Sequence, residues 1–354
     1  MKIGKWTGVY LGIIALMLRY LATSSPYLTE KWYTTGLYPL IRGLLDHTIV
    51  VLPFPTVYLL ILLLIYLGYR FFRKLFKIKS HKQRFFLFSR HILNFLGCLI
   101  FSFLILWAYN YYRIPLYQKL NLNPSPLSID LLIEEMETTQ QFLHTLRENV
   151  HPDSTNWPDI SDFTVQSTMI RDEMKSVLKE WQHGGKGSPV VKQFYPEATL
   201  RKLGIFGIYF PFTGEAYLDP SLHPLEKGFT MAHELAHGFG ITDEGEANFM
   251  AWLVCSQSSK AFFQYAATMK LFRYQLNDLY RMDSERYKEF LVHIPEPIKN
   301  DIREIQESNR AIVPFASELS RRSNDLYLKS QGVKAGVRSY AQLPMLVYAW
   351  KGKQ

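Results

Sequence analysis

The segment Met231-Ala-His-Glu-Leu-Ala-His237 decides the fold of this chain, because it places two histidines four positions apart. On a helix such residues share one face about one turn apart, so His233 and His237 can bind one tetrahedral Zn²⁺. Glu234 then lies beside the ion as a general base for water. The alternative is a polar helix face with two solvated histidines. Small and apolar neighbours, two glycines directly after the motif and the acids that follow them favour the metal site.

The third ligand is expected from the acidic stretch after the glycine turn, where three residues are candidates. Glu244 begins the pattern Glu244-x-x-x-Asn248, which resembles the second zinc helix of gluzincins, and we expect Glu244 to bind the metal. Asn248 would then accept a hydrogen bond from the free ring N–H of a ligating histidine. Asp243 fits the H-E-x-x-H-x-x-G-x-x-D spacing of metzincins, but no convincing Met-turn follows. Glu246 points elsewhere on that helix, and its alternative role is that of an exposed or capping acid.

Three apolar runs in the first third of the chain approach the ~20 residues that are needed to cross a bilayer. We expect transmembrane helices over about residues 6–22, 55–72 and 91–110, with aromatic residues at their ends. Arg19 interrupts the first run, but near the end of a helix its side chain can reach the membrane interface. A cleaved signal peptide is the alternative for this run, although no small-x-small site precedes Ser24.

Basic residues predict the orientation of these spans. Lys2 and Lys5 precede the first run, and eight basic residues with no acid lie between the second and third. Short loops rich in Lys and Arg stay in the cytoplasm, so three crossings place the rest of the chain outside it. We therefore expect a multi-pass inner-membrane protein with an extracytoplasmic domain. The eight basic residues are Arg70, Arg73, Lys74, Lys77, Lys79, Lys82, Arg84 and Arg90.

The net charge reports this topology. Residues 1–113 hold 14 basic and two acidic residues, a net charge of +12, whereas the whole chain carries +9, which leaves −3 for residues 114–354. A nucleic-acid-binding protein would gather basic residues on a soluble face, and this pattern is missing. The expected partners are thus the lipid bilayer and a peptide or protein substrate, with no nucleic acid.

The predicted fold class is α+β and mainly α, in three parts. Residues 1–113 form the membrane domain, residues 114–127 a linker, and residues 128–354 a domain large enough to bury its own core. Cys98 and Cys255 are expected as unpaired packing residues. A β-hairpin is predicted from residues 205–210 and 215–218, which flank a turn. Helical spacing of apolar residues predicts helices over about residues 128–149, 164–181, 259–309 and 314–330.

Three segments carry a resemblance to a known family. Glu244-Gly-Glu-Ala-Asn-Phe249 after the H-E-x-x-H motif, Trp107–Arg113 and Gly207–Glu215 resemble a bacterial, membrane-anchored, zincin-like family that is classed as a domain of unknown function. The resemblance implies a membrane metallopeptidase with a gluzincin-type zincin domain. It also implies an edge strand beside the metal, along which an extended peptide binds; the alternative is a hairpin that only covers the helix. Tyr340 could stabilise the oxyanion, as a tyrosine does in several gluzincins, or it packs in the core.

These features together predict hydrolysis of peptide bonds by Zn²⁺ bound to His233, His237 and Glu244, with Glu234 as general base. The alternative is a non-catalytic membrane scaffold or sensor with a structural zinc site. Glu234 favours catalysis, because a closed structural site needs no base between its ligands. A transporter is disfavoured, because the predicted spans contain no acid that could form a substrate pathway.

Overall fold

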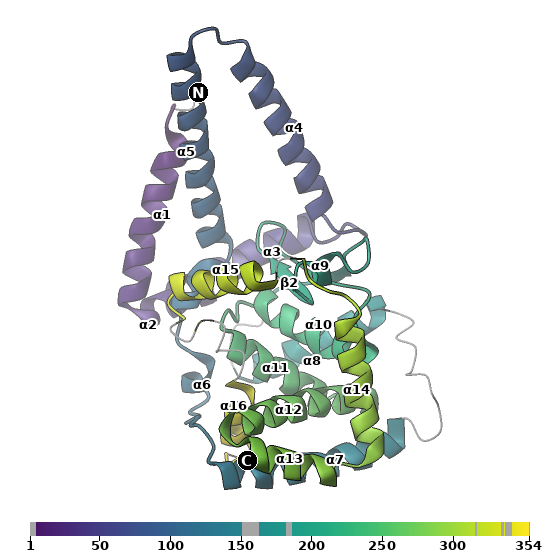
Figure 1. Ribbon diagram of the computed structural model, residues 1–354. Coiled ribbons are helices and arrows are strands. Elements are labelled where there is room, and N and C mark those ends of the chain that lie inside the picture. Colours follow the sequence, from purple (N-terminus) through teal and green to yellow (C-terminus); the bar gives the residue numbers. More distant parts are fainter. Residues whose placement is uncertain are drawn as a thin grey trace. The chain divides into compact units, whose positions relative to one another are not determined.

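The computed structural model describes residues 5–150, 163–181, 186–315, 317–333, 336 and 342–353 of the chain. Helices make up most of it, and strands are few and short (Figure 1). The chain divides into two compact units. Unit 1 comprises Met1–Ile114 and Phe210–Glu215, and unit 2 comprises Pro115–Tyr209 and Ala216–Gln354.

Unit 1 is built from the helices of the first third of the chain. They are α1 (Thr7–Ser24), α2 (Pro26–Leu28), the π-helix η1 (Thr29–Leu37), α3 (Tyr38–Thr48), α4 (Val57–Phe76), α5 (His81–Leu106) and the 3₁₀ helix η2 (Ala108–Tyr112). η1 and α3 lie between the first two predicted spans.

The helices α1 and α5 pack along each other in the same direction (Figure 1). Trp6 contacts Phe86 near their beginnings, with ring centroids 6.3 Å apart. Farther along, the Gly8 N–H donates to Asn94 Oδ1 at 2.8 Å. A Cβ on Gly12 would lie only 2.8 Å from the Cα of a glycine in α5, so a larger residue would push the two helices apart. Small residues at such an interface are typical of helix pairs in membranes.

Among the described residues, two helices, α1 and α5, are long and apolar enough to cross a membrane by length and composition, whereas the sequence predicts three. The second predicted span coincides with α4, a helix of 20 residues. Every stretch of 18 residues within α4 contains three charged residues, Arg70, Arg73 and Lys74, whereas α1 contains one and the last 18 residues of α5 contain one. The loop between α4 and α5 is also short, so most of the eight basic residues lie on the two helices that flank it.

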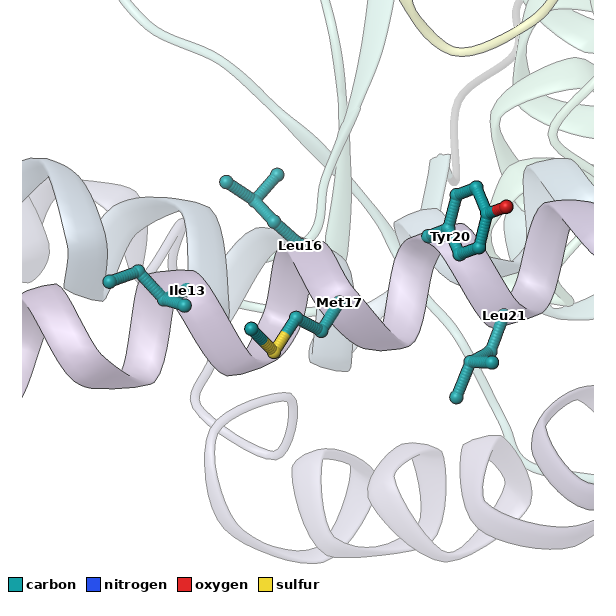
Figure 2. A pocket seen from close by; sticks show the side chains of 5 residues that line it. All are labelled: Ile13, Leu16, Met17, Tyr20 and Leu21. Atoms are coloured by element: carbon teal, nitrogen blue, oxygen red, sulfur yellow. The ribbon is translucent and has the colours of Figure 1, made fainter.

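The exposed surface of α1 is apolar. A shallow hollow on this helix is lined by Ile13, Leu16, Met17, Tyr20 and Leu21 (Figure 2). The exposed fractions of Leu18, Met17 and Tyr20 are 42%, 64% and 74%. Contiguous apolar surface of this kind is typical of contact with lipid or with another protein. Cys98 is exposed on α5 and is unpaired, as predicted, and Cys255 is unpaired and buried.

Unit 2 holds the remaining elements. They are α6 (Leu116–Lys119), α7 (Ile129–Val150), α8 (Phe163–Glu180), β1 (Val191–Gln193), α9 (Thr199–Lys202), β2 (Gly207–Phe210), β3 (Glu215–Leu218), α10 (Pro224–Gly238), α11 (Glu244–Ser256), α12 (Ala261–Met282), α13 (Ser284–His293), α14 (Glu296–Arg310), α15 (Ser317–Ser330) and α16 (Leu343–Lys351).

The three strands form one small sheet in the order β1-β3-β2. β1 runs parallel to β3, with Val191 opposite Ala216. β2 and β3 form the predicted hairpin, and the backbone N–H of Asp219 extends their pairing to the Phe206 carbonyl at 3.0 Å. β2 is therefore an edge strand of the sheet. The turn between β2 and β3 groups with unit 1.

The core of unit 2 lies mainly between α7 and α12. Apolar side chains on one face of each helix are fully buried there, among them Met136, Leu143 and Phe272. A polar network lies at its edge, where the Arg147 guanidinium donates to both Asp301 oxygens at 2.7 and 3.0 Å. Tyr265 donates its hydroxyl proton to the same carboxylate. This pairing satisfies a buried acid that would otherwise destabilise the core.

Residues 115–127, nearly the whole of the predicted linker (residues 114–127), are packed within unit 2. They include α6, and Leu116, Leu120 and Leu122 are buried. The carboxylate of Glu246 in α11 accepts hydrogen bonds from the backbone N–H groups of Leu116 and Tyr117 at the start of α6. These groups have no partner within the short helix, so Glu246 acts as its cap.

Candidate metal centre

The H-E-x-x-H motif lies on α10, which is a helix of the core. Pro224 occupies its first turn, and His223 caps the helix by accepting the Leu225 N–H at 3.3 Å. Thirteen of the 15 residues of α10 are buried. The small, apolar residues around the motif are therefore buried, and the two histidines do not lie on a solvated face.

A glycine turn ends α10 and returns the chain toward the histidines. Gly240 has φ +87°, a left-handed conformation that favours glycine. The N–H of Ile241 bonds to the Ala236 carbonyl at 3.0 Å, and the N–H of Gly240 bonds to the His237 carbonyl at 3.0 Å, which is the Schellman pattern. The same turn brings the Ile241 carbonyl to 2.7 Å from Nδ1 of His237.

Three side chains converge after this turn. Oε2 of Glu244 lies 3.1 Å from Nε2 of His233 and 3.3 Å from Nε2 of His237. All three side chains are buried, and their ligand atoms lie within 4.8 Å of one another, so they could hold a metal ion. Glu244 is the first residue of α11 and follows directly after the glycine turn. The turn therefore brings it back to the two histidines, although it lies seven positions after His237.

The electrostatics of this cluster require a positive charge at its centre. A carbonyl next to Nδ1 of His237 places the ring proton there, so that Nε2 presents a lone pair to the Glu244 carboxylate. Burial alone would lower the pKa of His237, but the Glu244 carboxylate raises it to about 9. Burial alone would raise the pKa of Glu244, but the two histidines hold it far below its usual range. A proton meets this demand in the metal-free chain, and a metal cation would meet it equally.

Glu234 lies beside the three converging side chains, against the edge strand β2. Its pKa is raised, because burial disfavours the charged carboxylate more than the neighbouring histidines favour it. The backbone N–H of Tyr209 donates to this carboxylate. Gly207 permits the approach, because a Cβ at that position would lie 2.8 Å from Cγ and 2.9 Å from Oε1 of Glu234.

The other two acidic candidates have structural roles. Asp243 is the N-cap of α11, where its Oδ1 accepts the Glu246 N–H at 3.0 Å. Glu246 points to the start of α6, as described above. Neither side chain belongs to the converging group. Of the three acids that the sequence leaves open, the structure brings Glu244 to the histidines.

Two further predictions concern Asn248, as the acceptor of a hydrogen bond from a ligating histidine, and Tyr340, as the group that stabilises the oxyanion. Asn248 donates its amide to the hydroxyl of Tyr274 at 3.3 Å, and the ring N–H of His237 bonds to Ile241 in place of Asn248. Burial raises the pKa of Tyr274 to about 12, so its hydroxyl stays protonated near Asn248. Tyr340 lies outside the described residues. No spacing in the sequence singles out Tyr274, Tyr209 or Gly207, because each reaches the site from a different element.

Comparison with known proteins gives one finding. No curated protein and no solved structure matches the chain significantly. A family model does match, and it covers residues 33–348, which include the second and third predicted spans and every described residue of the metal centre. The chain therefore belongs to the family described as "Protein of unknown function (DUF3810)".

Proposed function

We propose that this chain is a membrane-anchored, zinc-dependent peptidase. The proposal rests on the convergence of His233, His237 and Glu244 beside a buried Glu234 that is not part of the converging group. Two histidines and one carboxylate are a ligand set of catalytic zinc sites, which keep a fourth position for water or substrate. A structural site would close that position with a fourth protein ligand.

The spacing of the three ligand atoms supports zinc as the ion. Zinc binds imidazole nitrogen and carboxylate oxygen at about 2.0–2.1 Å, so neighbouring ligand atoms of a tetrahedral site lie about 3.3 Å apart. The contacts of the Glu244 oxygen with the two histidine nitrogens, 3.1 and 3.3 Å, are close to this value. The Ile241 carbonyl fixes the tautomer of His237, as partners of metal-binding histidines usually do.

Glu234 is the proposed general base and acid. When bound, Zn²⁺ polarises a carbonyl and lowers the pKa of water to about 7. Glu234 accepts the proton of the attacking water and passes it to the leaving amine. Its raised pKa suits the first transfer, because a carboxylate with a raised pKa is a stronger base toward the proton of the water. The Tyr209 N–H orients the carboxylate for these steps.

The proposed substrate is an extended peptide that adds to the edge of the sheet. β2 is the edge strand, and its residues Gly207 and Tyr209 adjoin Glu234. An extended segment that pairs with β2 would therefore carry its peptide bonds past the general base. Pairing of this kind uses backbone hydrogen bonds, which every peptide sequence can supply.

The proposed location is the inner membrane, with unit 2 outside the cytoplasm. α1 and α5 run in the same direction. If both cross the membrane, the chain must cross back between them, and α4, a helix of 20 residues, is the proposed return crossing. The basic residues at the end of α4 and the start of α5 favour the cytoplasm, as does Lys5 before α1. The chain then leaves α5 on the opposite side of the membrane.

Gly207→Ala is expected to lower hydrolysis at least about 10-fold while zinc binding is retained. The new methyl group would displace the Glu234 carboxylate, and small displacements of catalytic groups are costly. The three atoms nearest to it would belong to Glu234 and Thr230. Peptidase rates and zinc content of the purified variant check this result, with Ile208→Ala in the same strand as the control. Equal rates for both variants would show that the close approach of β2 has no catalytic role.

The proposal is tested by the metal content and activity of the purified full-length protein. We expect about one zinc ion per chain, and cleavage within a peptide library that stops with a chelator and returns with Zn²⁺. His233→Ala should remove both the metal and the cleavage. A zinc-loaded protein that cleaves no peptide would instead support the scaffold or sensor with a structural zinc site. A wild-type protein that binds no zinc would overturn the proposal.

A further inference from the structure

Unit 2 contains a cavity that is separate from the three converging metal-site residues. It has a volume of about 710 Å³, within the usual range of small-molecule sites, and residues of α12, α13 and α14 line it. Four of its lining residues are cationic, namely Lys270 and Arg273 on α12 and Lys299 and Arg303 on α14. Among the described residues, those that line the cavity include no acid.

The charge of these four side chains is only partly balanced. Glu226 contacts both cations on α12, at 2.9 Å from Nη1 of Arg273 and 3.6 Å from Nζ of Lys270. Glu296 lies 3.2 Å from Nζ of Lys299. Arg303 donates to the neutral Asn300 amide oxygen at 2.9 Å. Among the described residues, these four cations thus form ion pairs with two carboxylates, which leaves two of their positive charges unbalanced by such pairs.

Burial increases the effect of these unbalanced charges. Lys270 is largely buried, and burial lowers its pKa although Glu226 opposes the shift. An anion in the cavity would favour the charged form of Lys270 and gain from the weak solvent screening around it. The Arg273 and Arg303 guanidinium groups come from opposite helices, and each offers the paired donors that bind phosphate oxygens.

The rest of the lining is aromatic and aliphatic. Tyr280 and Tyr287 pack edge to face with ring centroids 5.2 Å apart and form one wall. Tyr274 adds a third ring beside Lys270. Apolar side chains complete the lining, namely Leu276, Leu291, Ile294 and Ile302. The cavity therefore combines a cationic region with a surface that suits the apolar part of a ligand.

We propose that this cavity binds a phosphate monoester that carries an apolar or aromatic group. A phosphate monoester holds about −1.5 to −2 charges at neutral pH, which matches the two unbalanced positive charges better than a single carboxylate does. The organic group packs on the tyrosines and aliphatic side chains, while the phosphate lies between the cations of α12 and α14. The binding is independent of the proposed peptidase reaction.

Calorimetric titration of the full-length protein in a neutral detergent tests the proposal, with phenyl phosphate as the probe. One molecule is expected to bind per chain, more tightly than inorganic phosphate or benzoate, which each lack half of the recognised chemistry. Arg303→Gln and Lys299→Gln should each weaken binding about 10-fold or more, because each removes a hydrogen bond between charged groups. Arg303 is exposed and Lys299 is half-buried, so the fold should persist.

Two controls make the result specific to the cavity. Arg310→Gln removes an exposed cation from the same helix outside the cavity and should leave the affinity unchanged. His233→Ala should also bind the probe, which excludes binding of its phosphate at the metal centre. Competition by micelles that contain phosphatidic acid would identify a lipid as the source of the phosphate, and its absence a soluble molecule. No binding of phenyl phosphate, wild-type affinity in both α14 variants, or loss of binding in His233→Ala would overturn the proposal.

Discussion

Glu234→Gln is expected to reduce peptide hydrolysis by roughly 10²- to 10⁴-fold, the contribution of a positioned acid–base group, while zinc remains bound. Glutamine keeps the size of the side chain, and its amide oxygen can still accept the Tyr209 N–H. The amide cannot accept the proton of an attacking water. Because the raised pKa shows that burial disfavours the charged carboxylate, a neutral group at this position should not destabilise the fold. The loss of activity is measured as the rate of hydrolysis of a peptide that the wild-type protein cleaves. The retention of the metal is measured as the zinc content of the purified variant.

The zinc content decides how a loss of activity is interpreted. Glu234 lies beside the three converging side chains and is not one of them, so its replacement should not change metal binding. Loss of zinc in Glu234→Gln would mean that this residue supports the metal, and the proposed mechanism would then be wrong. Unchanged hydrolysis with unchanged zinc would assign the base to another group. Thermal unfolding of the variant and the wild-type protein gives the matched control for folding.

The parts of this molecule that the sequence predicts are those set by local spacing. His233 and His237 share one face of α10 because they are four residues apart on a helix. The hairpin of β2 and β3 follows from two short apolar runs around a turn. The helices predicted over about residues 259–309 are α12, α13 and α14 in the structure, and their boundaries lie where Asp283 caps the start of α13 and Pro295 precedes α14. Both signals are present in the sequence, but the apolar spacing continues through them.

The parts that the sequence does not predict depend on contacts between distant segments. Glu246 is 130 positions from Leu116, and only the packed chain shows that its carboxylate caps α6. Gly207 lies close to Glu234 because the sheet places β2 against α10. Asn248 pairs with Tyr274 because α11 packs on α12, whereas its spacing from Glu244 predicts a histidine partner. Spacing along one helix identifies which residues share a face, but not which distant side chain lies opposite them.

Glu244→Ala is expected to weaken zinc binding by more than the roughly 10- to 100-fold that loss of a supporting residue typically costs. The carboxylate contributes one of three ligand atoms and the only negative charge among the converging groups. Without it, two neutral imidazoles would have to hold the ion. Zinc affinity of the purified full-length variants, measured by competition with a chelator of known affinity, gives the magnitude. His237→Ala should show a loss of similar size.

Two neighbouring acids provide matched controls, because each is buried or half-buried in the same turn and has a different partner. Asp243→Ala removes the N-cap of α11, so it should cost about 1 kcal/mol of stability and leave zinc affinity nearly unchanged. Glu246→Gln should weaken the cap of α6 and likewise retain the metal. If Asp243→Ala loses zinc and Glu244→Ala keeps it, the chain binds its metal in the metzincin manner, and the contacts of Glu244 with the two histidines serve only the fold.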